Sequence, residues 1–143
     1  MAGFGDKKQN KSAKENKRLE AVPSEKNHLD EALRAYQKGD ILRAKHILEK
    51  ATKIFPRSSV SLGFLATIEK ALGSKERALT LFEKSAMIDN NRPDILHNYS
   101  GLLEDQDLEK ALEISARAIS IAPSNSVYLE RNGYLKWKTG DLL

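Results

Sequence analysis

The sequence repeats at intervals of 34 and then 33 residues, and this repetition restricts the fold more than any other feature. The segment QKGDILRAKHILEKATKIFP, at residues 37–56, has a close copy at residues 71–90 and a looser one that ends at Pro123. Four columns of similar residues keep this interval: Ala44, Ala78 and Ala111; Ala51, Ser85 and Ala118; Ile54, Ile88 and Ile121; and Pro56, Asn90 and Pro123. A constant interval of this length is typical of repeat proteins, in which each unit packs only against its neighbours.

Within each unit, the apolar residues recur at the spacing of an α-helix. In the second half of the first unit they are Ile41, Ala44, Ile47, Leu48, Ala51 and Ile54, which lie along one helical stripe. The first halves of the units show the same spacing, beginning with Leu29, Ala32, Leu33 and Tyr36. Each unit is therefore predicted to be a hairpin of two helices. Because such a hairpin cannot bury its apolar face alone, it must stack on the next one.

The predicted turns inside the hairpins carry their own signals. Gly39, Gly73 and Gly140 stand where a first helix should end in the left-handed conformation that glycine adopts without steric cost. The residues that follow them are predicted to cap the second helices: Asp40, Ser74 and Asp141. In the third unit, residues 104–107 replace the glycine-containing link, and this is where the one-residue deletion is expected.

Small residues and prolines complete the pattern of each unit. The small residues are expected to let the two helices of a hairpin approach closely: Ala32, Ala66, Ser100 and Gly133 on first helices, and Ala44, Ala78 and Ala111 on second helices. Pro56 and Pro123 should end second helices, and Pro93 suits the first turn of the next helix.

With these residues the chain resembles the tetratricopeptide repeat (TPR) family. Counted from Glu25, the first unit has the family's small residue, turn, alanines and proline at Ala32, Gly39-Asp40, Ala44, Ala51 and Pro56. The family tryptophan is absent, and its place is taken by His28, Leu62, Leu96 and Leu129. The resemblance covers residues 25–143. It implies an all-α, right-handed solenoid of stacked hairpins at residues 24–143, with three units at about 25–58, 59–92 and 93–125 and the first helix of a fourth at 126–143.

Residues 1–23 differ in composition from the repeats. They hold six Lys or Arg and three acids, whereas the other residues are close to neutral. A stretch so poor in apolar residues is predicted to be disordered, and we interpret it as a basic, solubilising leader. The chain has no cysteine, and it shows neither a signal peptide nor an apolar stretch long enough for a membrane span. The expected location is the cytoplasm.

No catalytic, metal or cofactor site is predicted. No two of the three histidines, His28, His46 and His97, lie three or four residues apart, as two ligands of a metal on one helix would. We interpret them as surface residues. The acids are expected mostly on solvated helix faces, and no glycine-rich phosphate loop follows a predicted strand. The sequence therefore predicts neither an enzyme nor a cofactor-binding protein.

The resemblance to TPR proteins implies a partner groove on the concave face, which the first helices line. Carried over by position, the groove residues are Leu29, Leu33, Tyr36, Phe64, Thr67, Lys70, His97, Asn98, Glu104, Arg131, Tyr134 and Trp137. Such a groove suits an extended peptide or a helix of a partner protein, and self-association is a further possibility. One subfamily grips a C-terminal carboxylate with Lys, Asn and Arg. At the corresponding places this chain has Leu29, Leu33, Phe64, Asp94 and Asn98, so that mode is not expected.

Three hypotheses for the function follow. The first is a non-catalytic module that binds a protein or peptide in the groove. The second is the N-terminal TPR region of a longer enzyme of glycosyltransferase, sulfotransferase or methyltransferase type, because a second helix announced by Gly140-Asp141 does not follow before Leu143. The third is RNA binding by helical hairpins, which the nearly neutral repeat region disfavours. Neither the partner nor the role of the leader is specified by the sequence.

Overall fold

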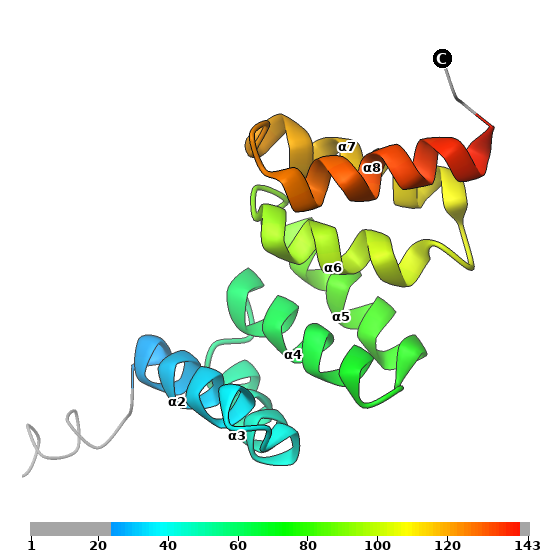
Figure 1. Ribbon diagram of the computed structural model, residues 1–143. Coiled ribbons are helices and arrows are strands. Elements are labelled where there is room, and N and C mark those ends of the chain that lie inside the picture. Colours follow the sequence, from blue (N-terminus) through cyan, green and yellow to red (C-terminus); the bar gives the residue numbers. More distant parts are fainter. Residues whose placement is uncertain (1–23, 141–143) are drawn as a thin grey trace, which may run out of the picture.

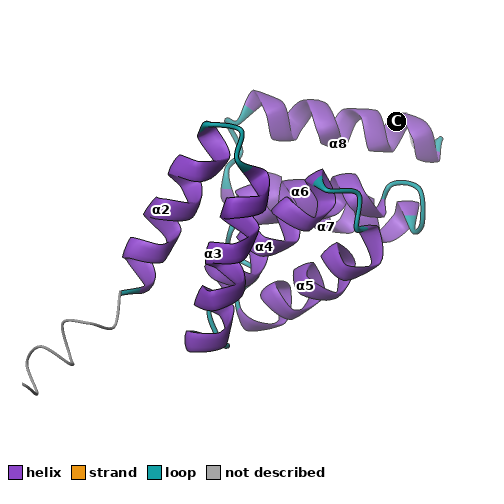
Figure 2. Cartoon of the chain, turned by 90° about the horizontal axis from the view of Figure 1, so that it is seen from below, coloured by secondary structure: helices purple, strands orange, loops and turns teal. Residues whose placement is uncertain are grey.

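Seven α-helices follow one another in residues 24–140, the part of the chain that the computed structural model describes. They are α2 (Glu25–Gln37), α3 (Ile41–Ile54), α4 (Ser59–Ala71), α5 (Lys75–Ile88), α6 (Pro93–Leu103), α7 (Leu108–Ile121) and α8 (Ser126–Thr139). Short loops join them, and this part of the chain has no strand (Figure 2). The predicted leader, residues 1–23, and the predicted cap Asp141 lie outside the described residues.

The helices form stacked antiparallel hairpins. The closest packing is within the pairs α2–α3, α4–α5 and α6–α7, and α8 packs mainly on α7. Figure 1 shows these layers following one another from α2 at one end to α8 at the other. The predicted all-α solenoid of three hairpins and one further helix is therefore confirmed. The shorter second interval arises in the third hairpin, because α6 has 11 residues where α2 and α4 each have 13.

The inner turns follow the glycine signals closely. Gly39, Gly73 and Gly140 have φ angles of 81°, 84° and 79°, in the left-handed region. The Asp40 side chain accepts a hydrogen bond from the Arg43 amide, as predicted for a cap. The prediction for Ser74 is wrong, since its side chain makes no capping hydrogen bond in the structure. α5 still begins directly after Ser74, so the turn between α4 and α5 forms around Gly73 without a side-chain cap.

The small residues lie where the paired helices touch. Ala32, Ala44, Ala66, Ala78, Ala111 and Ser100 are completely buried. Gly133 is the exception, because a Cβ built on it would meet nothing within 4 Å. No second helix covers α8 among residues 24–140, so this position has no helix to approach. Two of the largest buried side chains join the second and third hairpins, where the Phe82 ring stacks on Tyr99 with the ring centroids 5.4 Å apart.

Two predictions about burial differ from the structure. Ile54 and Ile88 belong to the apolar columns, yet they are 46% and 43% exposed, because each is the last residue of its helix and lies beyond the covered face. His28 was expected on the surface but is 7% exposed. It occupies the place of the family tryptophan, with its ring edge-on to Phe55 and its Nδ1 3.1 Å from the Ser24 carbonyl oxygen. His28 is therefore a core residue.

Candidate functional site

An apolar hollow lies between the three first helices α2, α4 and α6. It has a volume of about 330 Å³, and its lining residues are Leu29, Asp30, Leu33, Tyr36, Val60, Phe64, Thr67, Asp94, Ile95 and Asn98. These residues share one face because the first helices of successive hairpins stand side by side in the stack (Figure 1). We call this surface the apolar hollow.

The hollow offers aromatic and aliphatic area that water still reaches. Leu33 is 44% exposed and Tyr36 is 40% exposed, although both lie between packed helices. The Tyr36 ring stands edge-on to Phe64, with the centroids 6.3 Å apart. Two exposed carboxylates, Asp30 and Asp94, accompany the apolar residues. The arrangement suits an apolar side chain with a polar or basic neighbour.

Next to the hollow, three basic side chains from three helices converge around Gly101. A Cβ built on Gly101 would lie 3.1 Å from Lys70 Nζ of α4 and 3.3 Å from the Arg131 Nη2 of α8. His97, one helical turn before Gly101 on α6, lines a pocket of about 240 Å³ together with Arg131. We call Lys70, His97 and Arg131 the basic cluster.

Burial and neighbouring cations disfavour the charged forms of Lys70 and His97. Burial lowers the pKa of Lys70 below its ordinary value, and the nearby Arg131 charge lowers it further. Burial likewise lowers the pKa of His97, with additional repulsion from Arg131 and Lys70. Lys70 Nζ donates to the backbone carbonyl of Asn98 at 3.3 Å, which is a neutral acceptor. The cluster is therefore an electropositive region that the surrounding side chains leave incompletely neutralised.

Glu104 neutralises the outer part of this region. Its carboxylate lies 3.1 Å from Arg131 Nη1 and 3.0 Å from Lys138 Nζ. Burial would raise the pKa of Glu104, but the hydrogen bond from Lys138 and the two positive charges outweigh it, so the pKa lies below its ordinary value. The charge on Glu104 thus connects the end of α6 to α8.

The Tyr134 and Trp137 rings lie further along α8 with their centroids 6.0 Å apart, and Trp137 is 60% exposed.

The structure distributes the predicted groove residues over three neighbouring places. In the apolar hollow are Leu29, Leu33, Tyr36, Phe64, Thr67 and Asn98; around the basic cluster are Lys70, His97, Arg131, Glu104 and Tyr134; and further along α8 is Trp137, beside Tyr134. The sequence reasoning missed four lining residues of the hollow: Asp30, Val60, Asp94 and Ile95. Asp30, Val60 and Asp94 occupy the sixth, second and second positions of their units. In the TPR family the second and sixth positions also face the groove, so the unit position could have indicated these three residues.

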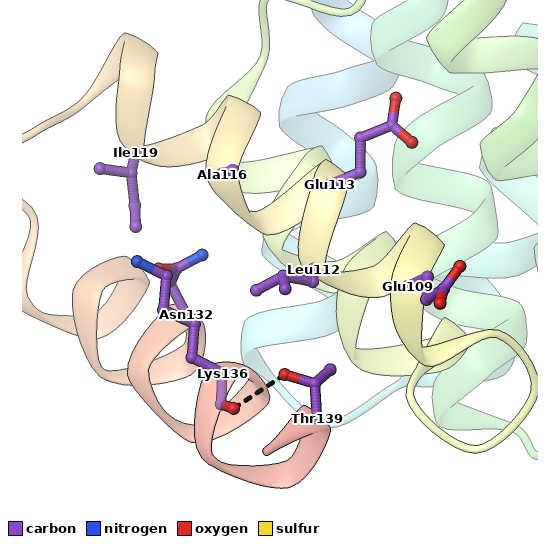
Figure 3. A pocket seen from close by; sticks show the side chains of 8 residues that line it. All are labelled: Glu109, Leu112, Glu113, Ala116, Ile119, Asn132, Lys136 and Thr139. Atoms are coloured by element: carbon purple, nitrogen blue, oxygen red, sulfur yellow. Dashed lines mark hydrogen bonds between the residues drawn. The ribbon is translucent and has the colours of Figure 1, made fainter. Parts of the chain in front are cut away.

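A second hollow lies between α7 and α8, on the face where a further second helix would pack. It has a volume of about 680 Å³ and is lined by Glu109, Leu112, Glu113, Ala116, Ile119, Asn132, Lys136 and Thr139. Figure 3 shows Leu112 and Ile119 of α7 facing Asn132 of α8 across it. The Nδ2 atom of Asn132 is buried without a hydrogen-bond partner among the described residues. Nothing in the structure shows what covers this face.

A buried carboxylate joins the first two hairpins. Glu69 of α4 is completely buried, an exception to the expectation that the acids lie mostly on solvated faces. Its Oε1 lies 3.2 Å from Lys45 Nζ of α3 and 3.4 Å from Arg77 Nε of α5, and both cations also approach Glu49. Charge pairs reach Oε1 of this carboxylate, and neither of its oxygens accepts a hydrogen bond within residues 24–140. The network thus ties α3 of the first hairpin to α4 and α5 of the second.

The described residues contain no group of three or more His, Cys, Asp or Glu that could hold a metal ion. Between residues 24 and 140, no helix is both long and apolar enough to span a membrane.

Neither the models of known protein families nor the sequences of curated proteins gave a match to the chain. Solved structures did. A mutant O-GlcNAc transferase of Thermobaculum terrenum aligns with a TM-score of 0.73 and 19% identity over 78% of this chain and 22% of its own. MamA from Desulfovibrio magneticus aligns with a TM-score of 0.70 and 17% identity over 83% of this chain and 68% of its own.

A third similar structure is the first TPR of Spaghetti (RPAP3), bound to the HSP90 peptide SRMEEVD. It aligns with a TM-score of 0.73 and 13% identity over 82% of this chain and 96% of its own. These similarities show that the described residues have a TPR fold. The chain spans about a fifth of the transferase, and at such low identities the likeness concerns the fold alone.

Proposed function

We propose that this protein is a non-catalytic interaction module that binds a peptide or helix of a partner protein along the face of its first helices. The observation that carries the proposal is the apolar hollow, in which partly exposed aliphatic and aromatic residues from three successive hairpins surround one space. Large apolar side chains in a concave site are the usual anchors of protein recognition. The TPR fold supports the same role, since one protein of similar fold is bound to a peptide.

The hollow favours a particular kind of ligand. Its apolar floor should accept one aliphatic or aromatic side chain of the partner, and the amide and hydroxyl groups of Asn98 and Thr67 should hydrogen-bond polar atoms beside it. The Asn98 Nδ2 lies 3.4 Å from the Thr67 Oγ1, so the two groups form one polar edge. A cytoplasmic setting stays a prediction.

The test is a selection of binding peptides from a random displayed library, followed by affinity measurements with the whole chain. The double variant Tyr36→Ala with Phe64→Ala should bind the selected peptides about tenfold or more weakly, because each truncation removes anchoring area. The matched control is Leu42→Ala with Met87→Ala, since these side chains are 69% and 87% exposed on the second helices α3 and α5. Equal affinity of the groove variant and the parent chain for every selected peptide would overturn the proposal.

A second candidate function is that of the N-terminal TPR region of a longer enzyme. The observation that favours it is the transferase of similar fold. The part of the transferase that matches is 22% of the transferase's own chain. The hollow between α7 and α8 is where a further repeat would pack. Sequencing the gene beyond the codon for Leu143 tests this candidate. A continuing reading frame that encodes further repeats or a catalytic domain supports it, and a stop codon excludes it.

A further inference from the structure

The apolar hollow carries negative charge that the other described residues do not neutralise. Asp30 of α2 and Asp94 of α6 line it, and its lining residues include no Lys, Arg or His. Both carboxylates are exposed, and none of the ion pairs formed within residues 24–140 includes either of them. The hollow therefore favours a segment that combines an apolar side chain with positive charge.

A further depression connects the hollow to the start of α2. It has a volume of about 530 Å³, and it shares Leu29, Asp30 and Val60 with the hollow. It also reaches Glu25, the residue next to the helix cap Ser24. The chain that precedes Ser24 thus joins the described residues at one end of a groove that leads to the hollow.

The leader, residues 1–23, has the composition that the hollow favours. Leu19 is the only large apolar residue between residues 5 and 21, and Lys17 and Arg18 directly precede it. With six Lys or Arg against three acids, the leader as a whole is positively charged. It therefore complements the hollow in both charge and apolar character.

The hollow also lies within reach of the leader. Leu29, the first residue of α2 in the hollow, follows Ser24 by five residues, which is about 8 Å along the helix. If residues 22 and 23 reverse the direction of the chain, residues 19–21 still extend back along α2 by about 10 Å. Leu19 therefore reaches the level of Leu29, and the two cations before it reach further into the hollow.

We propose that the leader occupies the apolar hollow of its own chain, with Leu19 on the apolar floor and Lys17 and Arg18 beside the carboxylates, and that a partner must displace it to bind. This inference rests on the proposed function for the partner and concerns the regulation of the same site. The leader is an internal competitor, so only a partner that binds more strongly than the leader gains access.

The strength of this competition follows from the tether. A segment on a short flexible link has an effective concentration of about 1 mM at a site within its reach. A leader that binds the hollow with a dissociation constant of about 0.1–0.5 mM is therefore bound most of the time. It should lower the apparent affinity of a competing peptide by about three- to tenfold, because only the fraction of chains with an empty hollow can bind.

The position of the leader can be measured without any partner. Because the chain has no cysteine, the variant Asn16→Cys takes a nitroxide spin label at a single place in the whole ¹⁵N-labelled chain. The label should broaden the amide signals of Leu33, Phe64 and Ile95 around the hollow. The amides of Lys84 and Met87 on the second helix α5 should keep their intensity, and the chemically reduced label gives the reference intensities.

Variants of the leader in the whole chain test the contacts. Leu19→Ser, and separately the pair Lys17→Gln with Arg18→Gln, should reduce the broadening around the hollow and should raise the affinity for selected peptides by about three- to tenfold. The matched control is Lys7→Gln with Lys8→Gln, which removes the same charge further from Ser24 and should change neither result.

The carboxylates of the hollow provide the reciprocal test. Asp30→Asn with Asp94→Asn should also reduce the broadening by the label at position 16. Only the broadening is read for this variant, because both residues line the site proposed for the partner.

Each failure identifies the claim that is wrong. Equal broadening on all helices, or none, would overturn the inference, and so would broadening that appears only when spin-labelled and ¹⁵N-labelled chains are mixed, since a second copy would then supply the leader. Peptides that depend on Tyr36 and Phe64 but bind the leader variants and the parent chain equally would overturn the competition and leave the proposed function intact. A leader located in the hollow, together with no selected peptide that depends on these two residues, would overturn the proposed function alone.

Discussion

Two glycines that lie inside first helices are expected to respond oppositely to the same substitution. A methyl group on Gly63 of α4 would lie 2.5 Å from Cδ1 and 2.8 Å from Cγ1 of Ile95 on α6, whereas one on Gly133 of α8 would meet nothing within 4 Å. Alanine in place of glycine stabilises a helix interior by about 1 kcal/mol. Gly133→Ala should therefore stabilise the chain by about that amount.

For Gly63→Ala the packing cost opposes the helix gain. The contact is with a buried, β-branched side chain that has few alternative rotamers, and overpacking of this kind costs about 1–3 kcal/mol. The net change ranges from about zero to a loss of about 2 kcal/mol. The two variants should thus differ in unfolding free energy by about 1–3 kcal/mol, or roughly 4–12 °C in melting temperature for a chain of this size.

Urea unfolding followed by circular dichroism measures both variants against the parent chain. Because Ile95 also lines the apolar hollow, Gly63→Ala should in addition weaken the binding of any selected peptide. A Gly63→Ala variant as stable as Gly133→Ala would refute the reasoning, because it would show that α4 and α6 separate without cost at this contact.

Three further predictions follow from the core and the charged groups. Replacing both Lys45 and Arg77 by Met leaves the buried carboxylate of Glu69 without a partner, and should lower the unfolding free energy by about 3–5 kcal/mol in urea unfolding. The variant Glu69→Met should lower it clearly less. A larger loss for Glu69→Met than for the double variant would contradict the assigned pairing. Because burial and neighbouring cations lower the pKa of His97, the unfolded chain takes up its proton first as the pH falls through the ordinary value of 6.5, so stability should decrease from there down to the lowered pKa. His97→Gln should reduce that decrease in thermal melts between pH 7 and pH 5, and an unchanged pH profile would show that other groups cause it. Ala44→Leu should destabilise the first hairpin by about 1–3 kcal/mol in the same urea assay, because Ala44 is completely buried where α3 meets α2, and an unchanged unfolding midpoint would contradict the close approach.

The features of the fold that repeat in the sequence could be predicted from it. The glycine turns could be predicted because they depend on one residue each. Glycine adopts a φ angle near 80° without steric cost, and all three glycines have such an angle. The same holds for Pro93 at the first turn of α6. The cap predicted at Ser74 failed, because a side-chain hydrogen bond depends on a rotamer that the sequence does not determine.

The charged contacts could not be predicted, because they join residues from different helices. Glu69 looks like one more acid on a helix until α3 and α5 place Lys45 and Arg77 beside it. The basic cluster is similar, since Lys70 and Arg131 are far apart in the sequence and come together only where both side-chain ends approach Gly101 of α6. Family positions indicated both residues individually, but not that they converge on one point.

The location of Arg131 on α8 links the groove to the last described helix. Since α8 packs mainly on α7, it should open more readily than the helices that lie between two hairpins. When α8 opens, Arg131 leaves the pocket that it lines with His97, so a partner bound there must hold α8 closed. Amide exchange in α8 should therefore slow as the groove fills. Occupancy of the groove and order in the last described helix become two measures of one equilibrium.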